Sequence, residues 1–462
     1  MRGKLPGIKR SASAIGRLPW LDRVRPYWGK EGGLRAVLVR GASGSFALRI
    51  ASMSLNFLAS LLIARLLGLA GYGAFAYAQS WVALLVVPAM LGLDLLLVRN
   101  IAAYRARFDW SLVKGLLRWA NRAVLTTSVG LSLLAATAAW FFGKSLEQQM
   151  LSAFLVGLSL LPLAALIYIQ QAAMRGLQRV VVGQLPEALI RPLLFLVLVG
   201  VAYAFLGENL GAAGAVGLSV VAAVVAFLIG ARLLHKALPY AVTQAYPTYR
   251  GREWMRSVPP LLFLGGMLVI ITQIPTILLG TMKGAEAAGA YAAVSRVALL
   301  ITFIMNAANL ALAPAIADLY ALGDMARLRR MVMKSTRFIL LFSLPLTLCL
   351  IVFNRQVLSI FGEGFTQGGA ALSILSLGYL FSAAMGSVGI LLIMTGYERD
   401  AATAIGASAV LNLVLNVALI PSYGLEGAAI ATATSIVVQN LLLTVVSHRR
   451  LGMHASALGR IG

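Results

Sequence analysis

Charge, cysteine and histidine are all scarce in this sequence. Only 12% of its 462 residues are charged and 60% are hydrophobic, whereas soluble domains average about 25% charged and about 45 to 50% apolar residues. So few charges cannot cover a water-facing surface, which excludes a soluble enzyme and a soluble nucleic-acid-binding domain. The single cysteine, Cys349, excludes a disulfide framework and a multi-thiolate metal site. The three histidines, His235, His448 and His454, are too scattered to cluster around a metal.

Long apolar runs fill most of the chain instead. A helix needs about 20 mostly apolar residues to cross a bilayer, and twelve such runs occur between residues 42 and 447. We therefore predict an all-α integral membrane protein with 12 transmembrane helices. In the third span, Trp119 and Trp140 lie 21 positions apart, about 31 Å of helix, which matches two aromatic belts at the faces of one bilayer. The predicted spans are 42–67, 72–98, 116–142, 150–174, 184–206, 211–234, 258–280, 288–316, 338–353, 370–394, 401–420 and 424–447.

The positive charge is distributed unevenly between the two sides of these spans. Thirty-two of the 39 Lys and Arg residues lie in the termini and in the loops after even-numbered spans. Cytoplasmic segments carry the positive excess in membrane proteins, so we predict a multi-pass protein of the cell (inner, cytoplasmic) membrane with both termini in the cytoplasm. The net charge of +24 is then mainly an insertion signal, and no nucleic-acid partner is expected. The basic segment 1–40 either anchors on anionic lipid or is a tail that only fixes topology.

Three short segments recur along the chain at nearly one offset. They are GAFA at 73–76 and GAYA at 289–292, GAA at 211–213 and 427–429, and GLQR at 176–179 and GYER at 396–399, with offsets of 216, 216 and 220. We infer two copies of a six-helix unit; since six is even, both cross in the same sense. Parallel repeats build transporters whose substrate site lies between the halves, which predicts a central cavity.

This repeat predicts the domain organisation. The predicted parts are a basic cytoplasmic amino-terminal tail (1–40), an amino-terminal six-helix lobe (41–234), a cytoplasmic linker (235–257), a carboxy-terminal six-helix lobe (258–447) and a cytoplasmic carboxy-terminal tail (448–462).

Several longer stretches resemble one transporter family. They are ARLLGLAGYGAFAYAQS (64–80), LGLDLLLVR (91–99), RGLQRVVVG (175–183), LLGTMKGAEAAGAYAA (278–293), ILLIMTGYERD (390–400) and PSYGLEGAAIATA (421–433). In order and spacing they are similar to the polysaccharide transporters of the multidrug/oligosaccharidyl-lipid/polysaccharide exporter superfamily. The resemblance implies a flippase that moves a polyprenyl-diphosphate-linked oligosaccharide to the outer leaflet, with membrane lipids and polysaccharide polymerase machinery as further candidate partners. Members often carry an acid in the seventh span near the position of Pro275, which this sequence lacks.

Charged residues inside the spans are the best candidates for a substrate site. An arginine at the bilayer centre costs about 2.5 to 3.5 kcal/mol, so Arg49, Arg191 and Arg296 are expected to face a cavity. Their planar donor forks suit the phosphate oxygens of a diphosphate. Asn56, on nearly the same helical face as Arg49, and Gln273 are further candidate substrate contacts. Such amides are also common contacts between helices.

Two acids, Asp94 and Glu187, are the clear carboxylates within the spans. They are the candidates for coupling transport to H⁺ or Na⁺, while the membrane potential is another possible driving force and no metal or cofactor is expected. Glu187 and Arg191 stand four residues apart, which also favours a simple ion pair within one helix.

Three other functions remain as alternatives. A cation-coupled drug exporter of the same superfamily tends to keep an acid buried in the amino-terminal half, whereas the first span here carries Arg49. A flippase for the peptidoglycan lipid precursor would handle the same diphosphate. A membrane polymerase or glycosyltransferase needs a large outer loop with catalytic carboxylates, and the longest outer connection, 354–369, offers only Glu363; we therefore predict that the protein is not an enzyme.

Overall fold

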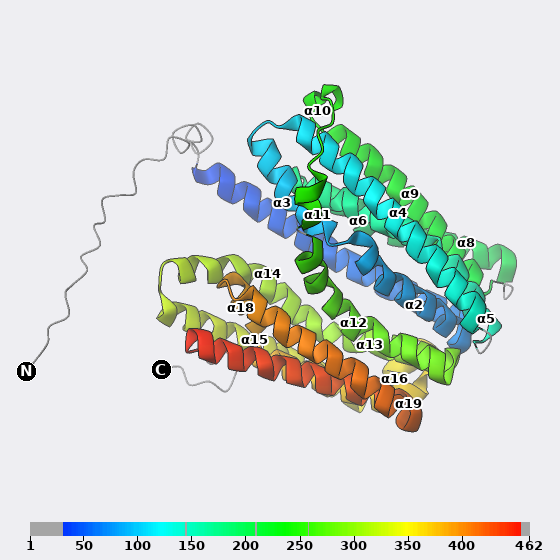
Figure 1. Ribbon diagram of the computed structural model, residues 1–462. Coiled ribbons are helices and arrows are strands. Elements are labelled where there is room, and N and C mark those ends of the chain that lie inside the picture. Colours follow the sequence, from blue (N-terminus) through cyan, green and yellow to red (C-terminus); the bar gives the residue numbers. More distant parts are fainter. Residues whose placement is uncertain (1–30, 144–145, 208–209, 257, 454–462) are drawn as a thin grey trace, which may run out of the picture.

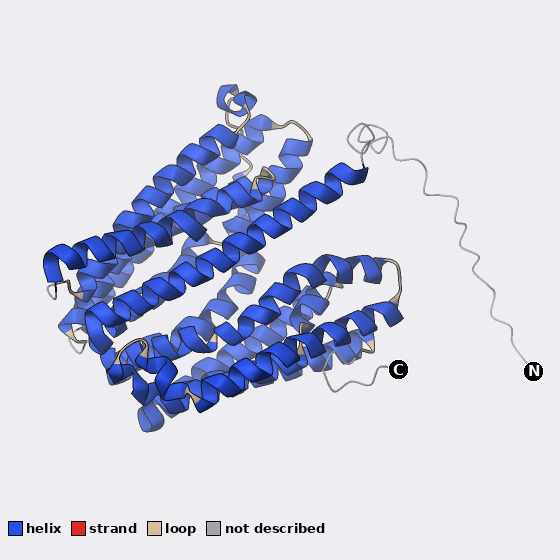
Figure 2. Ribbon diagram, turned by 180° about the vertical axis from the view of Figure 1, so that it is seen from behind, coloured by secondary structure: helices blue, strands red, loops and turns tan. Residues whose placement is uncertain are grey.

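Two helical bundles lie side by side in this protein (Figures 1 and 2). The computed structural model describes residues 31–143, 146–207, 210–256 and 258–453, and its regular elements within these ranges are helices. The predicted amino-terminal tail therefore falls mostly outside the described residues, as does the predicted carboxy-terminal tail beyond residue 453.

The amino-terminal bundle contains α2 (Glu31–Met90), α3 (Leu93–Ala106), α4 (Trp110–Phe142), α5 (Gln148–Leu158), α6 (Leu160–Gly176), α7 (Val180–Leu185), the π-helical turn η3 (Pro186–Ile190), α8 (Arg191–Leu206) and α9 (Ala212–Ala237). The linker contains α10 (Tyr240–Gln244) and α11 (Gly251–Arg256). The carboxy-terminal bundle contains α12 (Val258–Lys283), α13 (Ala285–Ala298), α14 (Leu300–Ala321), α15 (Met325–Val352), α16 (Asn354–Ser359), the 3₁₀ turn η5 (Glu363–Gly368), α17 (Gly369–Met385), α18 (Val388–Met394) and α19 (Glu398–Leu451).

The helices have the length and composition of membrane spans. Within the described residues, eight are long and apolar enough to cross a bilayer, or nine if α13 and α14, bent by 42° at their junction, count as one span. The prediction of an all-helical multi-pass membrane protein is confirmed. Two of the eight contain more than one crossing, because α2 and α19 each leave helical geometry at a glycine, Gly68 and Gly424. The count of 12 spans stays a prediction, as do the domain boundaries.

The chain reverses at these glycines. In α19, Asp400 Oδ2 lies 2.7 Å from Arg450 Nε, although fifty residues of straight helix would separate them by about 75 Å. In α2, Ser52 and Met90 line the same cavity, although a straight helix would hold them about 57 Å apart. Each long helix is therefore a hairpin of two spans.

Backbone geometry repeats along with the sequence. Gly68 (φ 68°, ψ −172°) and Gly284 (φ 89°, ψ −178°), 216 positions apart, both adopt a conformation that is open mainly to glycine. Asp109 (φ −81°, ψ 67°) and Asp324 (φ −81°, ψ 71°), 215 positions apart, precede α4 and α15 in matching turns. These matching turns support the two-copy organisation that the sequence predicts.

The copies meet where two equivalent glycines face each other. A Cβ atom on Gly73 would lie 1.7 Å from the carbonyl oxygen of Ala285, and one on Gly289 would lie 2.4 Å from that of Leu69. Gly73 and Gly289 are 216 positions apart, and so are Leu69 and Ala285, so each copy presents the same patch to the other, as in a two-fold dimer. We call this contact between α2 and α13 the glycine seam.

Further contacts join the bundles near the seam. Arg65 Nε donates to the carbonyl oxygen of Ile360 across 2.7 Å, and the backbone N–H of Ala285 donates to Glu147 Oε1 across 3.1 Å. The bundles converge at this end, which carries α5 and α16, and separate toward the end where α2 begins and α19 finishes (Figures 1 and 2). We call these the closed end and the open end.

The open end is basic. Asp324 caps α15 by accepting a hydrogen bond from the backbone N–H of Arg327, so this helix begins well before the apolar run predicted at 338–353. The turns of α15 before residue 338 are rich in Arg and Lys, so they do not form an apolar run in the sequence. Basic residues also fill the last turns of two other helices at this end: His235 and Lys236 in α9, and His448, Arg449 and Arg450 in α19.

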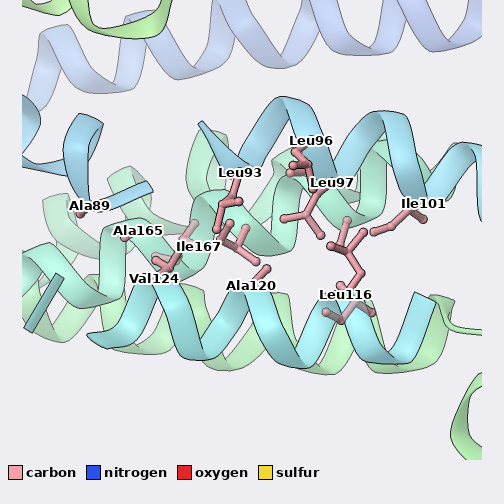
Figure 3. Packing of buried hydrophobic residues seen from close by; sticks show 14 of the residues in the cluster. Ala89, Leu93, Leu96, Leu97, Ile101, Leu116, Ala120, Val124, Ala165 and Ile167 are labelled. Carbon is pink, nitrogen blue, oxygen red and sulfur yellow. The ribbon is translucent and has the colours of Figure 1, made fainter. Parts of the chain in front are cut away.

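Within each bundle, the helices pack through apolar side chains that recur at helical spacing along one face. In the amino-terminal bundle, Leu93, Leu97 and Ile101 of α3 point toward α4 and α6 (Figure 3). The linker is fixed to the same bundle, because Trp254 of α11 is buried and its Nε1 donates to the Tyr104 hydroxyl across 3.1 Å. Trp119 packs on Trp254 with ring centroids 5.3 Å apart, so it contacts the linker; its place in an aromatic belt stays a prediction.

Candidate functional site

A cavity of about 730 Å³ lies between the bundles. Six of the seven residues singled out in the sequence line it: Asn56, Asp94, Glu187, Arg191, Gln273 and Arg296. They come from α2, α3, η3, α8, α12 and α13, so segments from both copies meet there. Arg49 is exposed on α2 but is not among the lining residues; its place in a substrate site stays a prediction.

The amino-terminal bundle supplies most of the cavity wall. Among the described residues, the carboxy-terminal bundle contributes only Val269 and Gln273 of α12 and Arg296 of α13. Arg296 follows Gly289 of the glycine seam by seven residues, two helical turns, so it lies on the same face of α13 and points into the cavity from its closed end.

Tyr72 of the opposite bundle lies beside Arg296. The Tyr72 hydroxyl interacts with the side chains of Arg296 and Ser60, and Tyr72 itself is buried against Phe365, with ring centroids 5.8 Å apart. Arg296 is an exposed residue and lines the cavity. Arg296 therefore lies beside a buried hydroxyl of the other bundle and is still exposed.

Arg191 is paired. Its Nη1 lies 2.6 Å from Glu187 Oε1, and the two side chains are 20% and 23% exposed, so the ion pair within one helix, an alternative favoured by their spacing, is confirmed. The pair lies at a π-helical turn, Pro186–Ile190, a distortion that often marks functional sites. Glu187 Oε2 is buried without a hydrogen-bond partner among the described residues.

The lining is therefore not uniformly cationic. Two arginines, Arg191 and Arg296, stand with two acids, Asp94 and Glu187, so the formal charges balance. Counting arginines within spans does not reveal this balance, because the sequence does not say which charges share a cavity. Among the described residues, no group of three or more His, Cys, Asp or Glu side chains lies close enough to hold a metal ion.

Neutral polar groups and stacked rings complete the cavity. Ser52, Asn56 and Ser60 form a polar stripe along α2; Asn56 Nδ2 donates to the Ser52 carbonyl across 2.7 Å, and Ser60 Oγ to the Asn56 carbonyl across 2.8 Å. This stripe was readable from the four-residue spacing. The rings of Phe75 and Phe195 stack 5.9 Å apart and both line the cavity.

Another polar contact was not predicted. Gln79 Nε2 donates to Ser219 Oγ across 3.2 Å, and both residues line the cavity. Their contact joins α2 to α9 and has no signal in local spacing. Taken together, amides, hydroxyls, stacked rings and a balanced set of two arginines and two acids give the cavity a polar lining.

Comparison with known proteins assigns this architecture to a class. The chain is similar in structure to a multidrug resistance MATE family transporter of the MOP superfamily in its inward-facing conformation, with a TM-score of 0.74, 14% identity, and coverage of 88% of this chain and 98% of the other. It is also similar to the lipid II flippase MurJ in an inward closed conformation, with a TM-score of 0.67, 12% identity, and coverage of 88% and 87%. The chain therefore shares the fold of these two membrane transporters.

The family follows from sequence. The profile described as "Polysaccharide biosynthesis protein" matches residues 38–320, and the MatE profile matches residues 260–418. The chain belongs to the polysaccharide biosynthesis protein family. It is 24% identical over 413 residues to the probable low-salt glycan biosynthesis flippase Agl15 of Haloferax volcanii, covering 88% of this chain and 82% of that protein.

Proposed function

We propose that this protein is a flippase for a lipid-linked oligosaccharide, whose head is joined to a polyprenyl chain by diphosphate. The observation that carries the proposal is the position of Arg296, which projects from one repeat into a polar cavity built mainly by the other. A guest bound to Arg296 touches both bundles, so its binding depends on how the bundles are arranged. Family membership and the resemblance to Agl15 support this class of cargo.

The ion pair supplies a second step. A diphosphate head that reaches Arg191 competes with Glu187, 2.6 Å away, for the same donor fork. If Arg191 bound the diphosphate in place of Glu187, the anion would be held and the Glu187 carboxylate would lose its partner. An unpaired carboxylate favours uptake of a proton or Na⁺. We propose Glu187 and Asp94, which both line the cavity, as the coupling site on this basis.

The transport cycle is proposed to alternate between two arrangements of the bundles. The excess of Lys and Arg supports a cytoplasmic position for the open end in a cell-membrane protein, and in that orientation the conformation described here would face inward. The oligosaccharide head of the lipid would enter from the open end. Separation of the bundles at the glycine seam would then release it to the outer leaflet, where polymerase machinery would use it.

Two rivals share this scheme. A peptidoglycan lipid precursor carries the same diphosphate, and a drug exporter would use the same fold. The cargo accumulated by cells lacking the protein distinguishes them. A polyprenyl-diphosphate oligosaccharide in the inner leaflet supports the proposal, an accumulated peptidoglycan precursor supports the first rival, and drug sensitivity without lipid accumulation supports the second.

The residue-level test is complementation of such a deletion. We expect Arg296→Ala to leave protein abundance normal and to abolish transport, and Arg296→Lys to retain part of it because the charge remains while the donor fork is lost. Arg232→Ala is the matched control, since Arg232 is an exposed arginine of α9 that lies outside the cavity lining. Full transport by Arg296→Ala at normal abundance would refute the role of this arginine.

A further inference from the structure

We propose that a second cavity, on the outside of the amino-terminal bundle, binds an anionic glycerophospholipid of the cytoplasmic leaflet by its phosphate head. The cavity measures about 680 Å³. It lies between α4 and α9, which both pack on α6, and the linker helix α10 borders it at the open end. It shares no lining residue with the central cavity, so it is a separate site, and its occupant does not depend on the cargo.

One end of this lipid groove is basic. Lys114, Arg118 and Arg122 stand four residues apart on one face of α4, and His235 faces them from α9. Like charges at this spacing repel each other, and among the described residues that line the groove none is acidic. Binding of an anion from outside the chain would relieve this repulsion.

Only some of these cations are satisfied within the chain. Lys114 Nζ donates to the carbonyl oxygens of Thr243 and Ala245, across 2.5 and 2.9 Å. Arg118 and Arg122 are exposed, and their guanidinium groups make no hydrogen bond or ion pair within the described part of the chain. Two donor forks are therefore available to one phosphate group.

The rest of the groove is apolar and borders surface that would face lipid. Leu125, Leu166 and Phe227 line it beyond the cations. Leu125 is 44% exposed, and Val129 and Leu228 on the same two helices are 40% and 53% exposed, so both flanking helices present apolar side chains outward. Trp119, the residue expected at the membrane interface, lies between Arg118 and Arg122 in sequence. The groove thus places a charged head at the interface and an acyl chain along the apolar wall, the arrangement of a lipid-binding pocket.

Charge complementarity decides the occupant. A neutral lipid would leave the two arginines unpaired, and a soluble anion would leave the apolar wall exposed. The lipid-linked cargo is the other amphiphile available, but its head must reach Arg296 in the central cavity, and this groove lies on the outer side of a single bundle.

The site also touches the connection between the repeats. Val242 and Thr243 of the linker line the groove, next to the carbonyl that Lys114 binds. A lipid seated there braces the linker on the amino-terminal bundle.

The test is lipid binding to the purified full-length protein in detergent. Binding of palmitoyl-oleoyl-phosphatidylglycerol is measured against the corresponding phosphatidylcholine, by native mass spectrometry and by the shift in the thermal unfolding midpoint. We expect the double variant Arg118→Gln/Arg122→Gln to bind phosphatidylglycerol about 30-fold more weakly, which is ~2 kcal/mol at ~1 kcal/mol per basic residue.

Two further variants make the test decisive. Lys334→Gln removes an exposed cation of α15, which lies 216 positions from Arg118 and outside the groove, and should bind as the unmodified protein does. Ala231→Trp fills the groove with every charge intact and should lose binding while eluting as a folded protein. Equal affinity for the two phospholipids, binding by the double variant as tight as by Lys334→Gln, or a polyprenyl lipid found in the groove would each overturn the proposal.

Discussion

Gly73→Ala is predicted to force the two bundles apart at the closed end. The new Cβ atom would lie 1.7 Å from the Ala285 carbonyl oxygen, whereas real Cβ contacts essentially never fall below 3.0 Å, so the backbones must separate by at least about 1.3 Å. The carbonyl oxygen belongs to the backbone and alanine has no side-chain rotamers, so no rotamer change relieves the overlap. Overpacking of this kind costs about 1 to 3 kcal/mol, which lowers the population of the closed seam about 5- to 150-fold.

The separation is measurable by pulsed electron spin resonance. Spin labels on Gln148→Cys of α5 and Gln356→Cys of α16, both exposed near the closed end, report the distance between the bundles once Cys349 has been replaced by alanine. In Gly73→Ala we expect a longer and broader distance distribution together with slower transport.

The matched control for this experiment is Gly130→Ala in α4. A Cβ atom there meets nothing within 4 Å, so the label distances and transport should match those of the parent. Gly289→Ala, with a contact of 2.4 Å, should resemble Gly73→Ala more weakly. If Gly73→Ala keeps the parental distances and transport rate, the seam is not the contact that closes this end.

Three further predictions concern other contacts. Trp254→Ala should lower the free energy of unfolding by about 3 to 5 kcal/mol and free the linker, because Trp254 is 1% exposed; denaturant titration measures the first, and protease cleavage between residues 238 and 253 the second. Glu147→Ala should weaken the closed end slightly, by about 0.3 to 1 kcal/mol, since it removes the carboxylate that accepts from the Ala285 N–H; unaltered label distances and thermal midpoint would contradict this. Asp94→Asn/Glu187→Gln should make transport in vesicles insensitive to an imposed H⁺ or Na⁺ gradient, and persistence of the gradient effect would exclude both acids.

Much of the fold could be predicted because a bilayer imposes long apolar helices. The repeat was visible because Gly73 and Gly289 are required for close backbone contact, and their neighbours recur with them. The boundary at Met325 was not predicted, because a basic helical extension outside the membrane has the composition of a loop. The burial of Trp254 was not predicted either, since it depends on which surface the linker crosses.

The candidate site was predicted in part. Arg191 and Arg296 stand out in apolar runs because an isolated charge there is costly. The same argument selected Arg49. The cost of a charge within a span indicates that the charge needs a polar partner or contact with water, but it does not indicate which cavity provides them. The sequence did not single out Arg118 and Arg122 as site residues, because their charges were counted only as part of the excess of Lys and Arg on one side of the spans.

The glycine seam has a consequence for assembly. Because residues 69–73 of the first copy and 285–289 of the second present matching surfaces to each other, each half carries a surface that could form the seam with a second copy of itself. Splitting the gene in the linker should yield two polypeptides that reassociate in the bilayer. The amino-terminal half alone should also pair with itself, reconstituting the single-length homodimer from which a tandem duplication of this kind would have started.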